Sequence, residues 1–210
     1  MLLWSIDYSF GAMQSVPYII GLVGGIGSGK SVVSRLLRIM DVPVYDCDSE
    51  AKRLMHENAT IRKLLVETIG TGVYDAIGRL DRAYLASYMF GDEERVALVN
   101  SIVHPVVRSD FKEWTRRMGK PIVAVESAIL FEAGMEDDVD VVWLIHASEE
   151  VRLLRAVKRD KTSEDAIRSR MQCQMSEQEY MERVDAVVYN GGNRSLIAQV
   201  KGLLDEISDK

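Results

Sequence analysis

Apolar residues in this chain gather in five short runs that are continuous rather than alternating. Such runs are typical of strands that are buried on both faces of a parallel sheet. They are YIIGLV at 18–23, VYD at 44–46, IVAVES at 122–127, VDVVWLIHA at 139–147 and AVVYN at 186–190. Segments with helical spacing separate the runs, so the pattern predicts a three-layer α/β fold with a five-stranded parallel sheet. The first such segment, at 31–40, is expected to bury Val32, Leu36, Leu37 and Met40.

The longest stretch without a strand pattern is 48–118, where the spacing is helical. Asn58, Asp81 and Asp92 precede three of its patterns, and their side chains can accept hydrogen bonds from the free N–H groups of a first helical turn. Pro105 lies inside the last pattern, where proline is expected to kink or split the helix. We therefore expect a helical insert beside the sheet.

The segment GGIGSGKS at 24–31 separates the first strand pattern from the first helical pattern. It matches GxxxxGK followed by Ser or Thr, the loop that wraps a nucleoside triphosphate. Glycines let the backbone N–H groups face the phosphates, where a Cβ would clash, and the helix start adds a positive dipole end. We expect Lys30 to reach the β- and γ-phosphates and the Ser31 hydroxyl to ligate Mg²⁺. The predicted phosphate-binding residues are Gly25, Ile26, Gly27, Ser28, Gly29, Lys30, Ser31 and, through its N–H, Val32.

Acidic residues follow two of the predicted strands, where ligands of open α/β sheets gather. Asp46 and Asp48 follow the second strand. A carboxylate there can accept the proton of an acceptor hydroxyl or hold a water of Mg²⁺. Asp48 can also cap the next helix, and the spacing leaves both roles open. Glu126 ends the third strand, either as a partner of Mg²⁺ through water or as an ordinary strand-end acid.

Basic residues share one side of the helix predicted after the fourth strand. Arg152, Arg155 and Arg159 have the spacing i, i+3 and i+7. This face suits a lid that closes over phosphates and spreads charge over a transition state. The alternative is a solvated face whose partners are Glu149, Glu150 and Asp160. Elsewhere, His104 either binds an anionic acceptor or packs at the kink of its helix.

The composition narrows the function classes. The chain has 210 residues and a net charge of −6, which argues against non-specific nucleic acid binding, because that needs a basic surface. No apolar run approaches the length of a membrane span. Cys47 and Cys173 form no CxxC pair and predict free thiols in a reducing compartment, so we expect a cytoplasmic location.

The glycine loop does not by itself identify the reaction. A GTPase should carry an NKxD guanine reader, and the sequence has none. A small-molecule kinase needs a group that receives the acceptor hydroxyl, a lid that excludes water, and cations around the phosphoryl group. The candidates are Asp46 and Asp48 for the acceptor hydroxyl, the basic helix face for the lid, and Glu126 as a partner of Mg²⁺. A kinase for another nucleotide or small metabolite stays open as an alternative, as does a nucleotide-dependent switch or ATPase.

Together these landmarks resemble the dephospho-CoA kinase family over residues 18–206. The motifs that carry the resemblance are LVGGIGSGKS at 22–31, VYDCDSEAK at 44–52, IVHPVV at 102–107, AILFEAG at 128–134, RLLRAVKRD at 152–160, RMQCQ at 170–174 and DAVVYNGG at 185–192. The chain departs from the family pattern at Glu126, where aspartate is usual, and at Val32, where threonine is common.

The resemblance implies a P-loop kinase that uses ATP and Mg²⁺ to phosphorylate the 3′-hydroxyl of the ribose of dephospho-CoA. It implies that Asp48 is the catalytic base and that Lys30 and Arg155 take part in catalysis. Further residues implied are Arg159 on the phosphates, Asn190 and Gly191 beside the adenine, and Asp46, Asp48, Lys52 and His104 on the acceptor.

The resemblance also divides the chain and implies a monomer or weak homo-oligomer that acts on a small molecule. The expected parts are an N-terminal extension at 1–17, a P-loop core at 18–47, 119–147 and 182–210, a dephospho-CoA-binding helical domain at 48–118, and a lid at 148–181.

Overall fold

The computed structural model describes residues 16–209, so most of the predicted extension at 1–17 lies outside the described residues. All five predicted strands are present and form one parallel sheet with the order β2-β3-β1-β4-β5. Their bounds are Tyr18–Val23 for β1, Val44–Asp46 for β2, Ile122–Glu126 for β3, Val141–His146 for β4 and Ala186–Tyr189 for β5. The predicted α/β fold is therefore confirmed.

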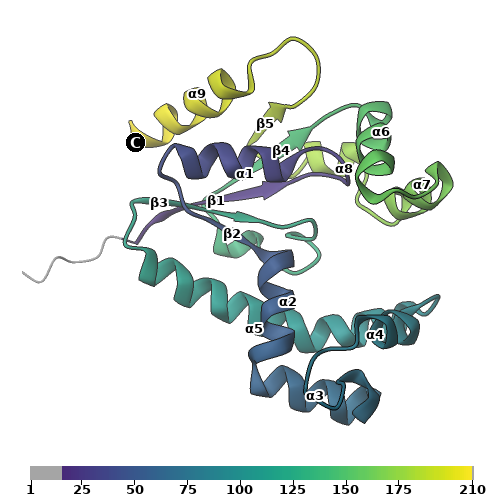
Figure 1. Cartoon of the computed structure of the whole chain (residues 1–210). Coiled ribbons are helices and arrows are strands. Elements are labelled where there is room, and N and C mark those ends of the chain that lie inside the picture. The colour runs from purple at the N-terminus through teal and green to yellow at the C-terminus, as the bar shows by residue number, and fades with distance from the viewer. Residues whose placement is uncertain (1–15, 210) are drawn as a thin grey trace, which may run out of the picture.

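Helices cover both faces of the sheet (Figure 1). On one face lie α1 (Lys30–Ile39) and α9 (Leu196–Ser208), which belong to a buried cluster with Trp143. On the other face lies the long helix α5 (Glu93–Met118), which shares a second buried cluster with strand residues such as Val125. The first layer supports the glycine loop, and the second joins the sheet to the helical insert.

The predicted buried side of α1 is wrong at one residue. Leu37 is buried and Leu36 and Met40 pack against the same cluster as predicted, but Val32 is 47% exposed and Val33 and Ser34 are buried. Val32 and Val33 are both apolar, so the hydrophobic pattern could not choose between them. The same side of α1 also buries Ser34, whose hydroxyl donates a hydrogen bond to Glu126 at the end of β3.

The insert contains α2 (Cys47–Glu57), α3 (Ala59–Ile69), the short 3₁₀ helix η1 (Thr71–Val73), α4 (Arg82–Met89) and the first part of α5. Asn58, Asp81 and Asp92 cap α3, α4 and α5 as predicted, each accepting a hydrogen bond from a backbone N–H of the first turn.

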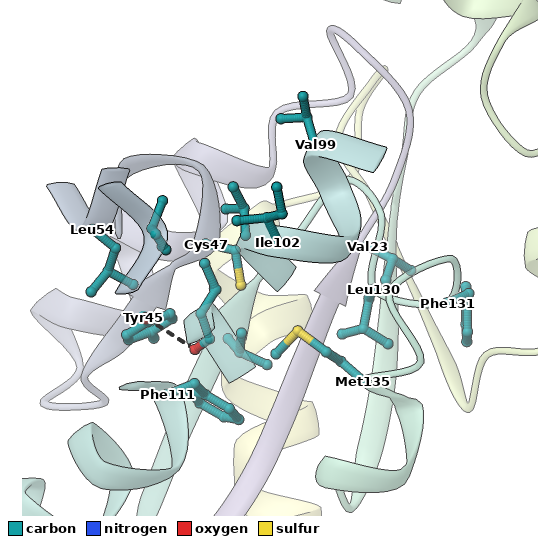
Figure 2. Close-up of a cluster of buried hydrophobic side chains, with 14 of the residues drawn as sticks. Val23, Tyr45, Cys47, Leu54, Val99, Ile102, Phe111, Leu130, Phe131 and Met135 are labelled. Carbon is teal, nitrogen blue, oxygen red and sulfur yellow. Dashed lines mark hydrogen bonds between the residues drawn. The ribbon is translucent and has the colours of Figure 1, made fainter. Parts of the chain in front are cut away.

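Figure 2 shows how the insert is anchored to the sheet. Tyr45 of β2, Leu54 of α2 and Phe111 of α5 belong to one buried cluster, and the rings of Tyr45 and Phe111 lie 5.3 Å apart between centroids. The Tyr45 hydroxyl also donates a hydrogen bond to Asp110 at 2.8 Å. The insert and the sheet therefore share one core.

Two of the alternatives that the sequence left open are excluded, namely Asp48 as the cap of α2 and a split of the helix at Pro105, while a kink at Pro105 stays a prediction. Asp46, not Asp48, caps α2: its carboxylate accepts the N–H groups of Asp48 and Ser49, because the helix already begins at Cys47. Pro105 does not split its helix, and α5 is one element of 26 residues. A proline removes one helical hydrogen bond, and buried side chains on both sides of Pro105 keep both parts of the helix packed in the core.

The segment predicted as the lid forms α6 (Glu149–Asp160) and α7 (Glu164–Gln172), followed by α8 (Glu177–Met181). Leu153, Ala156 and Ile167 make a small separate core between α6 and α7. Figure 1 shows this pair at the carboxyl ends of the strands, across from α4. The 3₁₀ helix η2 (Glu136–Asp138) precedes β4. Within residues 16–209, no helix combines the length and apolarity needed to cross a membrane.

Candidate active site

The glycine loop connects β1 to α1 in a shape that its neighbours impose. Gly27 and Gly29 have φ values of 78° and 97°, in the left-handed region that favours glycine. A Cβ on Gly27 would lie 2.2 Å from the carbonyl oxygen of Arg152, and one on Gly29 would lie 1.9 Å from Nδ2 of Asn190. A side chain at Gly27 would therefore push the backbone of α6 away from the loop, and one at Gly29 would displace the Asn190 side chain.

Lys30 begins α1 and turns back over the loop. Its ammonium donates a hydrogen bond to the carbonyl of Gly24 at 2.6 Å. Burial lowers the pKa of Lys30, while the carboxylates of Glu126 and Asp48 act in the opposite direction. An anion bound in the loop would favour the charged ammonium, as expected of a lysine that neutralises phosphates.

A cavity of about 450 Å³ opens beside the loop and contains most of the predicted phosphate site. Its lining includes Gly25, Ile26, Gly27, Gly29, Lys30, Ser31, Asp48, Glu126, Arg155 and Arg159. Ser28 and Val32 are not on its lining, since the Ser28 side chain is buried in the loop and Val32 points to solvent. The fold thus brings together residues from α1, α2, β3 and α6.

Three residues of this lining, Ala128, Arg170 and Gln174, were not assigned to the phosphate site from the sequence. The side-chain oxygen of Gln174 accepts the N–H of Ile26 at 2.8 Å, which ties the segment after α7 to the loop. Arg170 shares the carboxylate of Asp160 with Arg159. Arg170 and Gln174 both lie in RMQCQ at 170–174, one of the motifs that carry the family resemblance, so this segment contains the signal for them.

The arginines of α6 separate into two groups. Arg155 and Arg159 line the cavity, whereas the Arg152 guanidinium packs against Gly25 on another side of the loop. The solvated-face alternative describes only Arg159, which pairs with Asp160 at 2.6 Å. For Arg155, no carboxylate within the described part of the chain lies at ion-pair distance, and its guanidinium approaches the Ser28 carbonyl at 3.5 Å.

The carboxylates at the ends of β2 and β3 have different surroundings. Asp46 and Glu126 are neighbours in the strand register, and the Asp46 carboxylate also accepts the Ser49 hydroxyl at 2.7 Å. Asp46 does not line the cavity beside the glycine loop. The pKa of Glu126 is raised. Burial is the main cause and the nearby Asp46 and Asp48 add to it, although Ser34 and Lys30 act in the opposite direction. Asp48, in the first turn of α2, is exposed and faces the phosphate cavity.

A second cavity, of about 370 Å³, lies among α2, α4, α5 and the loop after β3. Its walls are mainly apolar, and polar groups come from Lys52, Asn100 and His104. Burial lowers the pKa of His104, and burial raises the pKa of the Cys47 thiol to about 12, so this cysteine stays protonated. Asp48 lines both cavities, so the two adjoin at this residue.

The end of β5 closes the site on the other side of the loop. The side-chain amide of Asn190 donates to the carbonyl of Ser28 at 2.8 Å. Its backbone N–H donates to the carbonyl of His146 at the end of β4, at 2.7 Å. Gly191 is exposed and lies beside Ala147. Asn190 and Gly191 are therefore placed together at the rim of the glycine loop.

The oxygen atoms at the mouth of the cavity suit Mg²⁺ chemically. Ser31 and Glu126 line the same cavity, and hydroxyl and carboxylate oxygens are the ligands that this ion prefers. No group of three or more His, Cys, Asp or Glu side chains is arranged to hold a metal among residues 16–209. The described residues alone therefore supply only part of a coordination shell, as is usual where phosphates supply the rest.

Comparison with known proteins agrees with this geometry. A family model described as dephospho-CoA kinase matches residues 18–195. A dephospho-CoA kinase of Bacteroides fragilis is 42% identical over 186 residues, which are 88% of this chain and 90% of that protein. The crystal structure of TT1252 from Thermus thermophilus is 35% identical and has a TM-score of 0.78, covering 92% of this chain and 99% of that one.

The fold is also shared with the dephospho-CoA kinase from Campylobacter jejuni, at 20% identity, a TM-score of 0.62, and coverage of 93% of this chain and 100% of that one. These matches confirm the expected P-loop kinase fold and the ATP-dependent kinase class. The chain belongs to the dephospho-CoA kinase family.

Proposed function

We propose that this protein transfers the γ-phosphoryl group of ATP to the 3′-hydroxyl of dephospho-CoA, giving coenzyme A and ADP. The observation that carries the proposal is the position of Asp48, which lines both the phosphate cavity and the apolar cavity. A hydroxyl that enters from the apolar cavity meets a carboxylate at the point where the phosphoryl group arrives. Asp48 accepts the proton of the 3′-hydroxyl as the new P–O bond forms and the bond to the β,γ-bridging oxygen breaks.

The glycine loop and the arginines bind the phosphates. The N–H groups at the start of α1 and the Lys30 ammonium hold the β- and γ-phosphates, in place of the Gly24 carbonyl that Lys30 now contacts. Arg155 and Arg159 approach from α6 and offset the charge that spreads over the transferring group. Asn190 and Gly191 contact the adenine at the rim of the loop.

Mg²⁺ would be held by the Ser31 hydroxyl and, through water, by Glu126, because both line the phosphate cavity. When bound, the ion would neutralise charge on the β- and γ-phosphates. Ser31 and Glu126 come from α1 and β3, which pack in the same core, so the two backbone positions are fixed relative to each other before any ligand binds.

The helical insert at 48–118 binds the acceptor in this proposal. The apolar cavity is closed by Ala51 and Met55 of α2 and by Val103 and Val107 of α5, surfaces that suit the non-charged parts of dephospho-CoA. Lys52 and His104 stand among them as groups for its polar and anionic parts. Contact of Asp46 with the acceptor stays a prediction beside its role as the α2 cap.

In the same proposal the sheet and its helices at 18–47, 119–147 and 182–210 form the P-loop core, and residues 148–181 form the lid. The protein is cytoplasmic and is a monomer or a weak homo-oligomer. The described cysteines are free, in line with a reducing compartment. Closure of α6 and α7 over the phosphates would exclude water from the transfer.

The decisive experiment measures ADP release from ATP and Mg²⁺ with dephospho-CoA, adenosine, AMP or no acceptor, together with mass analysis of the product. We expect release that depends on dephospho-CoA and a product heavier by one phosphoryl group. Equal release with adenosine, AMP or water would contradict the proposed acceptor while leaving the nucleotide site intact.

A further inference from the structure

A buried hydroxyl on α1 makes an unusual contact. Ser34 follows Lys30 by one helical turn and is completely buried among apolar residues of α1 and the sheet. A buried hydroxyl is costly unless it is hydrogen-bonded. The Ser34 hydroxyl donates to Oε2 of Glu126, at the end of β3, at 2.7 Å.

This contact differs from the ordinary behaviour of a buried hydroxyl in a helix. Such a group usually donates to the carbonyl three or four residues earlier. Thr115 in α5 does so, since its hydroxyl donates to the Phe111 carbonyl at 2.9 Å. Ser34 instead bonds to a side chain 92 residues away in sequence. The hydroxyl is therefore directed at the active site and not at its own helix.

Glu126 needs an external restraint if it is to act on phosphates. Its side chain has three rotatable bonds, one more than aspartate, and each free bond allows the carboxylate to turn away. Within residues 16–209, the Ser34 hydroxyl is the hydrogen-bond donor to this carboxylate, and it occupies Oε2. Oε1 accepts no such hydrogen bond from the described residues, and Glu126 lines the cavity that also contains Lys30 and Ser31.

We propose that Ser34 is a positioning residue: by holding Oε2 of Glu126 against α1, it presents Oε1 to the metal-bound nucleotide in the phosphate cavity. The proposal rests on the proposed function only as far as nucleotide and metal binding, and not on the identity of the acceptor. The restraint acts before any ligand binds, because α1 and β3 are both part of the core.

The test measures binding of Mn²⁺, as a probe for Mg²⁺, to the enzyme–ADP complex by electron paramagnetic resonance. We expect Ser34→Ala to weaken Mn²⁺ binding about tenfold, the effect of losing one hydrogen bond to a charged group. ADP binding without metal should be unchanged. Ser34→Thr, which keeps the hydroxyl, should restore most of the affinity, and Ser34→Cys, a weaker donor of similar size, should lie between.

Two controls separate positioning from a structural role. Thr115→Val removes another buried helical hydroxyl at a distance from the site and should leave Mn²⁺ binding unchanged. In a Glu126→Ala background, Ser34→Ala should have no further effect on Mn²⁺ binding, since the group that it positions is gone. An unchanged affinity in Ser34→Ala, or the same loss with Glu126 already removed, would overturn the proposal. Normal Mn²⁺–ADP binding without phosphorylation of dephospho-CoA would contradict the proposed acceptor alone.

Discussion

The side-chain amide of Asn190, at the end of β5, donates a hydrogen bond to the carbonyl of Ser28 in the glycine loop at 2.8 Å. The two residues are 162 positions apart in sequence. The segment after β5 therefore holds the loop that precedes α1, so the proposed nucleotide site is assembled from segments near both ends of the described residues.

Asn190→Ala should weaken ATP binding about tenfold, because it removes both this hydrogen bond and the group proposed to meet the adenine. The KM for dephospho-CoA should change little, since Asn190 does not line the apolar cavity proposed to bind the acceptor. Isothermal titration with ATP and steady-state kinetics with each substrate would measure the two effects. A change confined to the dephospho-CoA KM would show that Asn190 does not support the nucleotide site.

Lys30→Ala should lower kcat/KM for ATP by about 100-fold or more, because it removes a preorganised charge from the transferring phosphate. Thermal stability should not fall, since burial opposes the charged form of Lys30 in the free protein and lowers its pKa. Kinetics at saturating dephospho-CoA and a thermal melt without ligand would check both statements. Near-normal turnover would contradict the phosphate-binding role.

Asp48→Asn should lower kcat by about 100-fold or more while ATP binding stays nearly normal, because a general base acts in the chemical step. Stability should be unaffected, since Asp46 and not Asp48 caps α2. Asp46→Ala is the matched control and should destabilise the protein by about 1 kcal/mol through loss of the cap. If Asp48→Asn lowered the melting temperature and left kcat intact, Asp48 would have a structural role instead.

An acidic residue on η2 predicts a pH dependence of stability. Burial acts to raise the pKa of Asp138, but its ion pairs with Arg108 and with Lys112, at 2.9 Å, outweigh burial and lower the pKa. A lowered pKa in the folded state stabilises the protein above the ordinary value of 3.8 and ceases to do so as the pH falls below it.

Asp138→Asn should therefore lower the free energy of unfolding by about 1 kcal/mol at pH 7, and the difference from the unmodified protein should shrink below the ordinary Asp pKa. Urea unfolding at pH 7 and near pH 3 measures this. A difference that stayed constant across that range would exclude the ion pairs as its source.

Short-range patterns in the sequence determined much of this protein. The five strands follow from apolar runs, and Asn58, Asp81 and Asp92 cap their helices as predicted. The phosphate-binding loop was also predictable, since its glycines, lysine and serine are consecutive. In each case a few neighbouring residues satisfy their own hydrogen bonds or backbone geometry, so the local sequence contains the cause.

Only the tertiary structure decided how these pieces meet. The strand order places β1 between β3 and β4, which brings Glu126 beside the loop and Ser34 beneath it. It also sets Asp48 at the junction of two cavities and Arg170 on the phosphate lining. These relationships join residues far apart in the chain, and they follow from which apolar faces pack together. Spacing and residue type do not predict this packing. Val32 and Val33 are the same residue type, as are Asp46 and Asp48, and only their surroundings in the folded protein distinguish them.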